Sequence, residues 1–315
     1  MTFVEAVRTA ILPVLAIAGV GVVLGRYRDV SVETLSTVTI YVLVPALVFS
    51  SLATTSLGGS AVVSILVGVV AFTILMIGMA EVGARAIGES GPLRSGMVLT
   101  SAFSNAGNYG IPLSAFAFGA VGRSTAILYI SVQAVLMYTV GVYVAGRGAS
   151  GRRSGAFFEI FKLPLAYAVI AAGLARALDL VPPPGGVVMQ TITLTGDAAI
   201  PVMLVMLGVQ LANTDYGGTI SRVWAPTALK MVVAPIVAVA IALAIGFTDP
   251  AVGRVFVLES AMPAAVTSLL LTIEYGGESG LEAAEYVSTA ILVTTLLSIP
   301  ILAVLIGILQ SGALI

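Results

Sequence analysis

Two stretches with polar residues interrupt an otherwise apolar sequence, and their residue types suit the binding of a solute or a cation. The first, residues 104–114, reads SNAGNYGIPLS, and the second, residues 257–268, reads VLESAMPAAVTS. Asn105 and Asn108 each carry an amide donor and a carbonyl acceptor. Glu259 carries a carboxylate, a ligand that hard cations prefer. The chemistry predicted here is recognition of a small polar solute together with a coupling ion.

Both stretches also contain residues that break helices. Pro112 and Pro263 lack a backbone donor and clash with the preceding turn, and Gly110 lowers helix propensity. Unwound backbone at membrane depth persists only where it is buried in protein or lines a wet cavity. We therefore expect the two breaks to meet at one cavity, where half-helix N-termini attract anions and exposed carbonyls attract cations.

The predicted site residues lie in or near these breaks. The predicted substrate-binding residues are Asn105, Asn108, Tyr109, Gly110, Pro112, Pro263 and Thr267. The predicted coupling-ion ligands, for Na⁺ or H⁺, are Glu259, Ser104, Asn105 and Gln133. Four of these residues have a structural alternative: Glu259 as partner of a basic group or helix terminus, Tyr109 as a packing residue, and Gln133 and Thr267 as ordinary interhelical hydrogen-bonding groups.

Asp197 and Lys230 are two further ionisable residues within predicted spans. They are predicted to pair with each other across the seventh and eighth spans, which lowers the cost of burying both. The alternative is that Lys230 draws an anion toward the site.

The composition excludes several classes of protein. Of 315 residues, 59% are hydrophobic and only 9% charged, whereas a soluble domain is about 25% charged. The absence of Cys and His removes disulfides, thiolate and imidazole metal sites, and Cys- or His-based catalysis. The net charge of −1 gives no nucleic-acid footprint. We expect no enzyme and no cofactor, with a Ser–Lys dyad using Lys230 as the one catalytic alternative left open.

The hydrophobic pattern predicts an all-α integral membrane protein with ten spans, each of about 20 apolar residues. The N-terminal run is interpreted as a retained span, because Glu5 precedes Arg8 and the run continues to Gly25. The predicted spans are 7–25, 34–53, 60–80, 95–119, 124–146, 160–180, 185–212, 224–247, 252–275 and 286–310.

Matched prolines predict an internal repeat. Three pairs occur in corresponding spans, two of them 151 residues apart and one 156 apart: Pro13 with Pro164, Pro112 with Pro263, and Pro45 with Pro201. Coincidence is the alternative, since Pro is common in membrane helices. Repeats at 1–146 and 160–315, joined by a short basic linker at 147–159, would each hold five spans. An odd number inverts the second repeat, the layout of many secondary transporters.

Basic residues predict the orientation. One side of the ten-span arrangement holds Arg26, Arg28, Arg85, Arg94, Arg147, Arg152, Arg153, Lys162 and Arg222; the other holds Arg8, Arg123, Arg176 and Arg254. The positive-inside bias makes the first side cytoplasmic. Both termini are then expected outside the cytoplasmic membrane.

The two breaks carry recognisable motifs. Residues 105–113 match Asn-x-Gly-Asn-x-Gly-(Leu/Ile)-Pro-Leu, and the second break reads AMPAAVTSLLLTIEYGG, with Ser-Thr-Ala following at 288–290. Over essentially the whole chain these features resemble the auxin efflux carrier family of PIN-like membrane transporters. The resemblance implies the fold shared with bile acid:sodium symporters, in which spans 1, 2, 6 and 7 form a scaffold and spans 3–5 and 8–10 form a core. It also implies crossing helices in spans four and nine, and elevator-like alternating access. It implies that Asn105 faces substrate, that Glu259 is similar to an acidic residue that helps to hold sodium in the symporter branch, and that homodimers occur.

The sequence also departs from the plant carriers. Residues 163–165 read Leu-Pro-Leu where those carriers tend to have Asn-Pro-Asn, a glutamine is typical where Glu259 stands, and the long cytoplasmic loop is missing. The predicted function is a secondary transporter of small organic anions, auxin-like or short mono- and dicarboxylates. The alternatives are a sodium-coupled symporter of bile acid-like or other organic acids, a potential-driven uniporter, and a channel.

Overall fold

The structure, a computed structural model, describes residues 7–55, 57–148, 164–213, 220–276 and 280–314. Most of the predicted linker at 147–159, with Arg152 and Arg153, lies outside these residues, as does Lys162 at the start of the predicted sixth span. Over the described residues the chain is helical, with one isolated antiparallel bridge between Ser104 and Ala264 and no strand.

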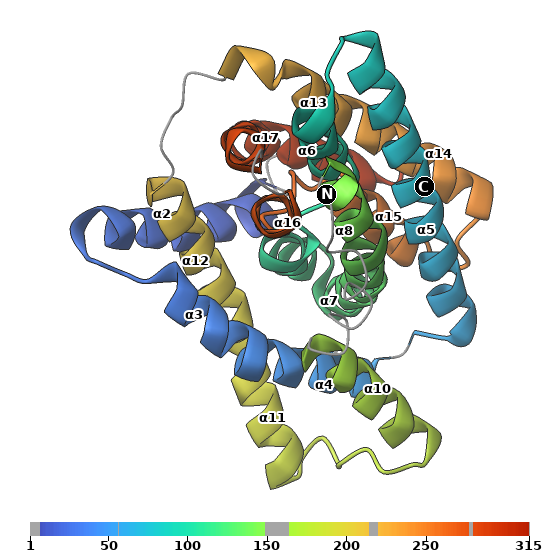
Figure 1. The fold of residues 1–315 in the computed structure, drawn as a ribbon. Helices are drawn as coiled ribbons and strands as arrows, with labels where there is room; N and C mark the ends of the chain where they lie inside the picture. Colours follow the sequence, from blue (N-terminus) through green and yellow to red (C-terminus); the bar gives the residue numbers. More distant parts are fainter. Residues whose placement is uncertain (1–6, 56, 149–163, 214–219, 277–279, 315) are drawn as a thin grey trace.

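The described residues form fifteen α-helices, and Figure 1 shows how they are arranged. Those of the first half are α2 (Leu12–Tyr27), α3 (Val32–Val38), α4 (Val44–Thr54), α5 (Gly59–Ala86), α6 (Gly91–Ala102), α7 (Ile111–Leu136) and α8 (Val142–Ala145). Those of the second half are α10 (Pro164–Ala177), α11 (Val187–Asp197), α12 (Ala199–Asn213), α13 (Trp224–Ala228), α14 (Ala234–Ile245), α15 (Pro250–Ser260), α16 (Thr267–Tyr275) and α17 (Gly280–Ser311). Single π-helical turns continue several of them, including Thr39–Leu43, Ala106–Gly110, Met137–Gly141 and Leu229–Val233.

The structure confirms a multi-pass helical protein. Six helical stretches among the described residues are long and apolar enough to cross a membrane: Val32–Thr54, Gly59–Ala86, Ala106–Ala145, Val187–Ala212, Trp224–Ile245 and Ala283–Ser311. The apolar helices α2 and α10 are shorter. The predicted fourth and ninth spans do not qualify as single helices, because each is divided by its break, into α6 and the start of α7 and into α15 and α16.

Gly119 divides α7 into two helical segments. Its backbone has φ +63° and ψ −140°, a conformation that side-chain-bearing residues rarely adopt. The residues before it belong to the predicted fourth span and those after it to the predicted fifth. The glycine thus permits the chain to turn between two spans without a loop.

The helices form two groups (Figure 1). One group, at the left and bottom of the view, contains α2, α3, α4, α10, α11 and α12; α2 packs along α12, and α4 packs against α10 and α11. The other group contains α5 to α8 and α13 to α17, with α7 packed against α5 and α15. We call these the α2–α12 group and the α7–α15 group.

Small residues permit the close contact of α2 with α12. A Cβ atom added to Gly208 would overlap the carbonyl oxygen of Ala18, and one added to Gly21 would overlap that of Val205. Backbones of membrane helices approach this closely where glycine replaces bulkier residues, and packing then takes the place of the hydrophobic effect as the attractive force.

Candidate functional site

The two helix breaks are hydrogen-bonded to each other through their backbones. The Asn105 N–H donates to the Pro263 carbonyl at 2.8 Å, and the Ala265 N–H donates to the Phe103 carbonyl at 3.0 Å. Each unwound segment thereby provides hydrogen-bond partners for backbone groups of the other. These groups have no partner within a helix, and lipid offers none. The predicted meeting of the two breaks is observed as this pair of bonds.

Side chains form hydrogen bonds with the backbone groups at the centre of this contact. Gln133 accepts from the Ser104 N–H at 3.0 Å and donates from Nε2 to the Ser104 carbonyl at 2.8 Å. On the other segment, Thr294 Oγ1 accepts from the Ala264 N–H at 3.2 Å. Both ends of the Gln133 amide therefore hold the first break in place, and its role as an ion ligand stays a prediction.

Lys230 lies behind the first break and is fully buried. Its ammonium donates to Ser104 Oγ at 2.7 Å and to the Ser260 carbonyl at 3.3 Å, and it stands 5.5 Å from the centre of the Phe72 ring. The Ser260 hydroxyl also shares a hydrogen bond with Tyr129 at 3.2 Å. One basic group is thus fixed next to both unwound segments.

The predicted pair of Asp197 with Lys230 is wrong. Asp197 accepts from Arg123 at 2.7 Å, and its side chain is 53% exposed. The reason is architectural: Asp197 ends α11 in the α2–α12 group, whereas Lys230 points into the interior of the α7–α15 group. A hydropathy pattern places both residues within spans, but it does not specify which neighbours they face.

Glu259, at the end of α15, is fully buried on another side of the first break. Its Oε1 accepts from Ser114 at 2.5 Å, while Oε2 has no hydrogen-bond partner among the described residues. A Cβ atom on Gly110 would overlap this carboxylate, so the glycine provides its space. Within the described residues, no ion pair joins Glu259 to Lys230. Of the predicted ion ligands, Glu259 thus bonds Ser114, which was not predicted, whereas Ser104 bonds Gln133.

A cavity of about 190 Å³ opens at the contact of the two breaks. Its walls come from both helix groups, since α4 and α10 contribute Val44 and Leu165. Its polar residues are Ser104, Asn105, Asn108, Gln133, Tyr138 and Thr267. The Nδ2 group of Asn105 is buried without a hydrogen-bond partner in the described structure. One lining residue thus has an unused amide donor, and the described lining residues include no Asp, Glu, Lys or Arg.

Four predicted substrate-binding residues do not line this cavity. Tyr109 is 2% exposed in the apolar core, with its hydroxyl bonded to Ser298. Gly110 faces Glu259, Pro112 lies in the first turn of α7, and Pro263 contributes only its carbonyl to the contact of the breaks. Residues in an irregular segment do not follow the helical periodicity that places side chains on one face.

Sequence reasoning missed three residues that form hydrogen bonds at the breaks. Ser114 bonds Glu259, the Ser260 carbonyl accepts from Ser104, and Thr294 accepts from Ala264. Their signal is weak but identifiable. Each is a small polar residue in an apolar span, a residue type that commonly forms interhelical hydrogen bonds. Ser114 also follows Gly110 at helical spacing, so both face Glu259.

Long apolar helices, with two breaks that bury their backbone groups against each other beside a polar cavity, define a multi-pass membrane protein. The family model described as "Membrane transport protein" matches residues 6–306, and the chain belongs to this family, which confirms the resemblance to the PIN-like auxin efflux carriers. The chain is also similar to a protein of Methanothermobacter thermautotrophicus described as an uncharacterized transporter. The two are 26% identical over 287 residues, covering 88% of this chain and 89% of that protein.

Proposed function

We propose that the protein is a secondary transporter of small organic anions and that the cavity at the two breaks is its substrate site. The observation that carries this proposal is that Asn105, which lines that cavity, has a buried amide donor without a hydrogen-bond partner among the described residues. An unmet buried donor costs about 1–3 kcal/mol, and a carboxylate oxygen of a substrate would satisfy it.

The size and lining of the cavity support a short monocarboxylate as substrate. Its volume of about 190 Å³ is below the ~300–1,000 Å³ of sites for drug-sized ligands. Multiply charged anions usually require arginine, and the described residues that line this cavity include none. A bulky bile acid-like substrate is disfavoured on size, and a dicarboxylate on charge.

We further propose alternating access by movement of the α7–α15 group against the α2–α12 group. The two groups correspond to the core and scaffold that the resemblance implies, and the cavity lies between them, with α4 and α10 on one side and the breaks on the other. The same proposal includes ten spans in two inverted repeats, the cytoplasmic membrane as location and both termini outside.

The position of Lys230 argues against a sodium ion at Ser104 and so favours transport without sodium coupling. Its ammonium already donates to Ser104 Oγ and the Ser260 carbonyl, which are oxygen atoms that a Na⁺ ion would otherwise use. A fixed positive charge beside the cavity also attracts an anionic substrate. The membrane potential would then suffice to drive export of the anion.

Sodium-coupled symport is the second candidate, and Glu259 favours it. The Oε2 atom is fully enclosed and lacks a hydrogen-bond partner among the described residues. An isolated carboxylate at membrane depth requires a proton or a cation. Thermal stability of the purified protein in NaCl, compared with KCl or choline chloride at equal ionic strength, distinguishes the candidates, because a bound ion stabilises the folded state. A sodium-specific rise that Glu259→Gln abolishes supports symport, and equal stability in all three salts contradicts it.

The substrate proposal is tested by uptake into proteoliposomes from a panel of short mono- and dicarboxylates. Asn105→Ala is expected to raise the KM for the transported acid ~10-fold, in line with the loss of one hydrogen bond to a charged group. Gln190→Ala is the matched control, because Gln190 is an exposed amide that bonds Gly185. An unchanged KM in a well-folded Asn105→Ala protein would exclude this cavity as the substrate site.

A further inference from the structure

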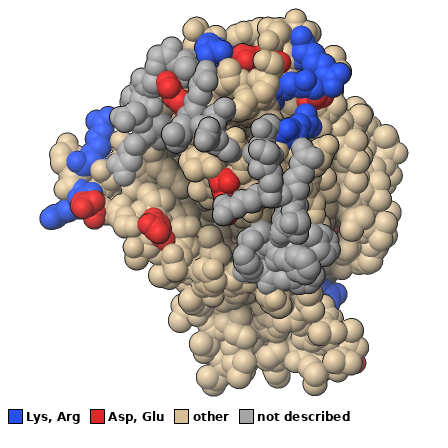
Figure 2. Space-filling view, in the orientation of Figure 1, with Lys and Arg blue, Asp and Glu red and all other residues tan. Residues whose placement is uncertain are grey.

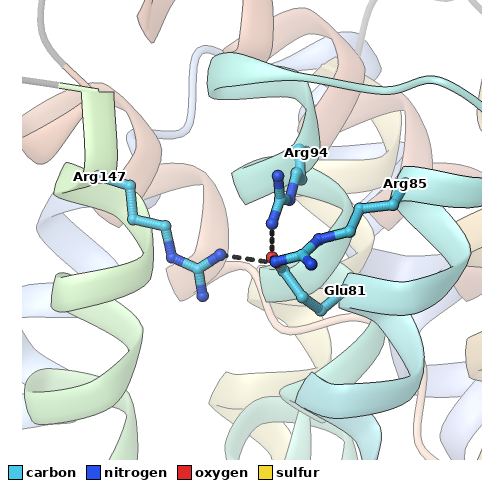
Figure 3. A network of polar contacts seen from close by, with 4 residues as sticks. All are labelled: Glu81, Arg85, Arg94 and Arg147. Carbon is cyan, nitrogen blue, oxygen red and sulfur yellow. Dashed lines mark hydrogen bonds and ion pairs between the residues drawn. The ribbon is translucent and has the colours of Figure 1, made fainter.

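One carboxylate, that of Glu81, is shared by three arginines at the end of α5 (Figure 3). Arg85 contacts Oε1 at 3.1 Å from the next turn of the same helix, and Arg147 contacts Oε2 at 2.8 Å from the turn after α8. Arg94 contacts Oε1 from α6. We call these four residues the Glu81 cluster. It joins α5, α6 and the turn after α8, all in the α7–α15 group.

The Glu81 cluster has an excess of positive charge, because three guanidinium groups face one carboxylate. The neighbouring pair of Arg222 with Glu89, at 3.9 Å, is neutral and does not compensate it. The Arg85 side chain is 66% exposed, and those of Arg94 and Arg147 are 28% and 29% exposed. Figure 2 shows basic side chains gathered at the upper right, over the end of the molecule where α5 meets α6. The guanidinium donors that Glu81 does not use are therefore accessible to an anion at the surface of the protein.

The cluster lies at the depth of lipid headgroups. The 28 residues of α5 extend about 42 Å, whereas the hydrocarbon layer is ~30 Å thick, and Glu81 stands in the last two turns. Val82, next to Glu81, is 68% exposed, as expected for a side chain that faces lipid. Tyr143, 56% exposed, has its ring 5.9 Å from the Arg147 guanidinium, and exposed tyrosines mark the membrane–water interface.

We propose that the Glu81 cluster binds the phosphate headgroup of an anionic phospholipid, on the side that the basic residues predict to be cytoplasmic. Arginine forks bind phosphate oxygens with two parallel hydrogen bonds, and basic pockets between membrane helices on the cytoplasmic side bind anionic headgroups. Arg85 and Arg147 each retain donors that Glu81 does not use. The acyl chains of the same lipid would lie along the apolar surface at Val82. The site is distinct from the proposed substrate cavity, and its occupancy stabilises the contact of α5, α6 and α8.

The test is a thermal-stability titration of the purified full-length protein with phosphatidylglycerol, against phosphatidylcholine of the same acyl chains. We expect phosphatidylglycerol to raise the apparent Tm and phosphatidylcholine to leave it unchanged. Arg85→Gln and Arg147→Gln should each increase the half-maximal phosphatidylglycerol concentration ~5-fold, the effect of losing about one basic residue near an anionic headgroup. Arg28→Gln, an exposed arginine beyond the end of α2 and on the same predicted side, should leave it unchanged.

Two results would overturn the proposal. One is the same half-maximal concentration for wild type, Arg85→Gln and Arg147→Gln, which would assign any stabilisation to another surface. The other is an equal rise in Tm with inorganic phosphate at matched phosphate concentration, which would make the cluster a site for free phosphate. If one variant does not fold, the other still decides between these results, because the two arginines stand on different helices.

Discussion

At the residue scale, Lys230 is the least ordinary feature of the protein. The described residues place no carboxylate within ion-pair distance of it, and its partners are a hydroxyl, a carbonyl and an aromatic ring. A basic residue costs up to about 2.5–3.5 kcal/mol on insertion scales when it lies at the centre of a membrane span, and less toward its ends. Two hydrogen bonds compensate only part of that cost. The charge itself is therefore the feature for which a function must be sought.

Lys230→Met is expected to retain or raise the thermal stability of the protein while weakening carboxylate binding at least ~10-fold. The physical reason is that methionine removes an uncompensated buried charge, together with the positive potential behind Asn105. Stability and substrate affinity should be measured on the same preparation. A loss of stability with unaltered affinity would assign Lys230 a purely structural role.

Gly110→Ala is expected to destabilise the protein by about 1–3 kcal/mol, the usual cost of overpacking, because the added methyl group would overlap the Glu259 carboxylate. Gly107→Ala is the matched control in the same π-helical turn, since its nearest neighbour is an Ile130 carbon at 4.0 Å. Unfolding curves for both variants test the difference. In a Glu259→Ala background the cost of Gly110→Ala should disappear, and its persistence would show that the backbone at 110, not the carboxylate, requires glycine.

At the element scale, the sequence predicts that the breaks exist but not how they align. Glycine, proline and asparagine in an apolar span indicate interrupted helices, and the structure has α6, α7, α15 and α16 interrupted there. Pro112 and Pro263, which match in the predicted repeat, occupy different places relative to their breaks. Pro112 lies in the first turn of α7, beyond the break, whereas Pro263 lies in the break and bonds Asn105. Alignment is set by backbone hydrogen bonds between distant segments, for which a single sequence has no local signal.

The candidate site shows the same limit. Asn105, Asn108 and Thr267, predicted to bind substrate, line the cavity, and their role in binding stays a prediction. Tyr109 and Pro112 do not line it, because an irregular segment has no fixed angle per residue. The partners of Asp197 and Lys230 depend on which helix group each span joins, and hydropathy does not contain that information.

Gly208→Ala is expected to lower stability by about 1–3 kcal/mol, because its Cβ would overlap the Ala18 carbonyl and neither backbone can move without separating α2 from α12. Gly19→Ala is the control: Gly19 follows Ala18 in α2, and its added Cβ would have nothing within 4 Å. Thermal unfolding of both variants in detergent tests the expectation. Equal stabilities would mean that the two helices are not in close contact in solution.

At the scale of the whole molecule, the two helix groups are connected by a charged contact that any relative movement must break. Arg123 in α7 bonds Asp197 at the end of α11, and nearby the Ser124 hydroxyl reaches the Ser51 carbonyl in α4 at 3.4 Å. The ion pair is partly exposed, with Arg123 at 26% and Asp197 at 53%, so its strength is modest. A contact of this strength can hold one conformation and still release on the timescale of transport.

Cross-linking across this contact should stop transport if the two groups move. The chain has no cysteine, so an Arg123→Cys, Asp197→Cys double variant carries the only two thiols. A short reducible bifunctional thiol reagent is expected to abolish uptake into proteoliposomes, and reduction is expected to restore it. The single-cysteine variants, treated in the same way, control for modification alone.

The matched control joins two positions within one group. Arg85 and Arg94 contact the same oxygen of Glu81, from α5 and α6 of the α7–α15 group. An Arg85→Cys, Arg94→Cys protein treated with the same reagent should keep its uptake relative to the untreated double variant, because the two helices would move together. Full uptake by the cross-linked 123–197 protein would contradict movement between the groups, and the cavity would then have to open by local rearrangement of the breaks. Loss of uptake only in the cross-linked 123–197 protein would show that transport requires the α7–α15 group to move against the α2–α12 group.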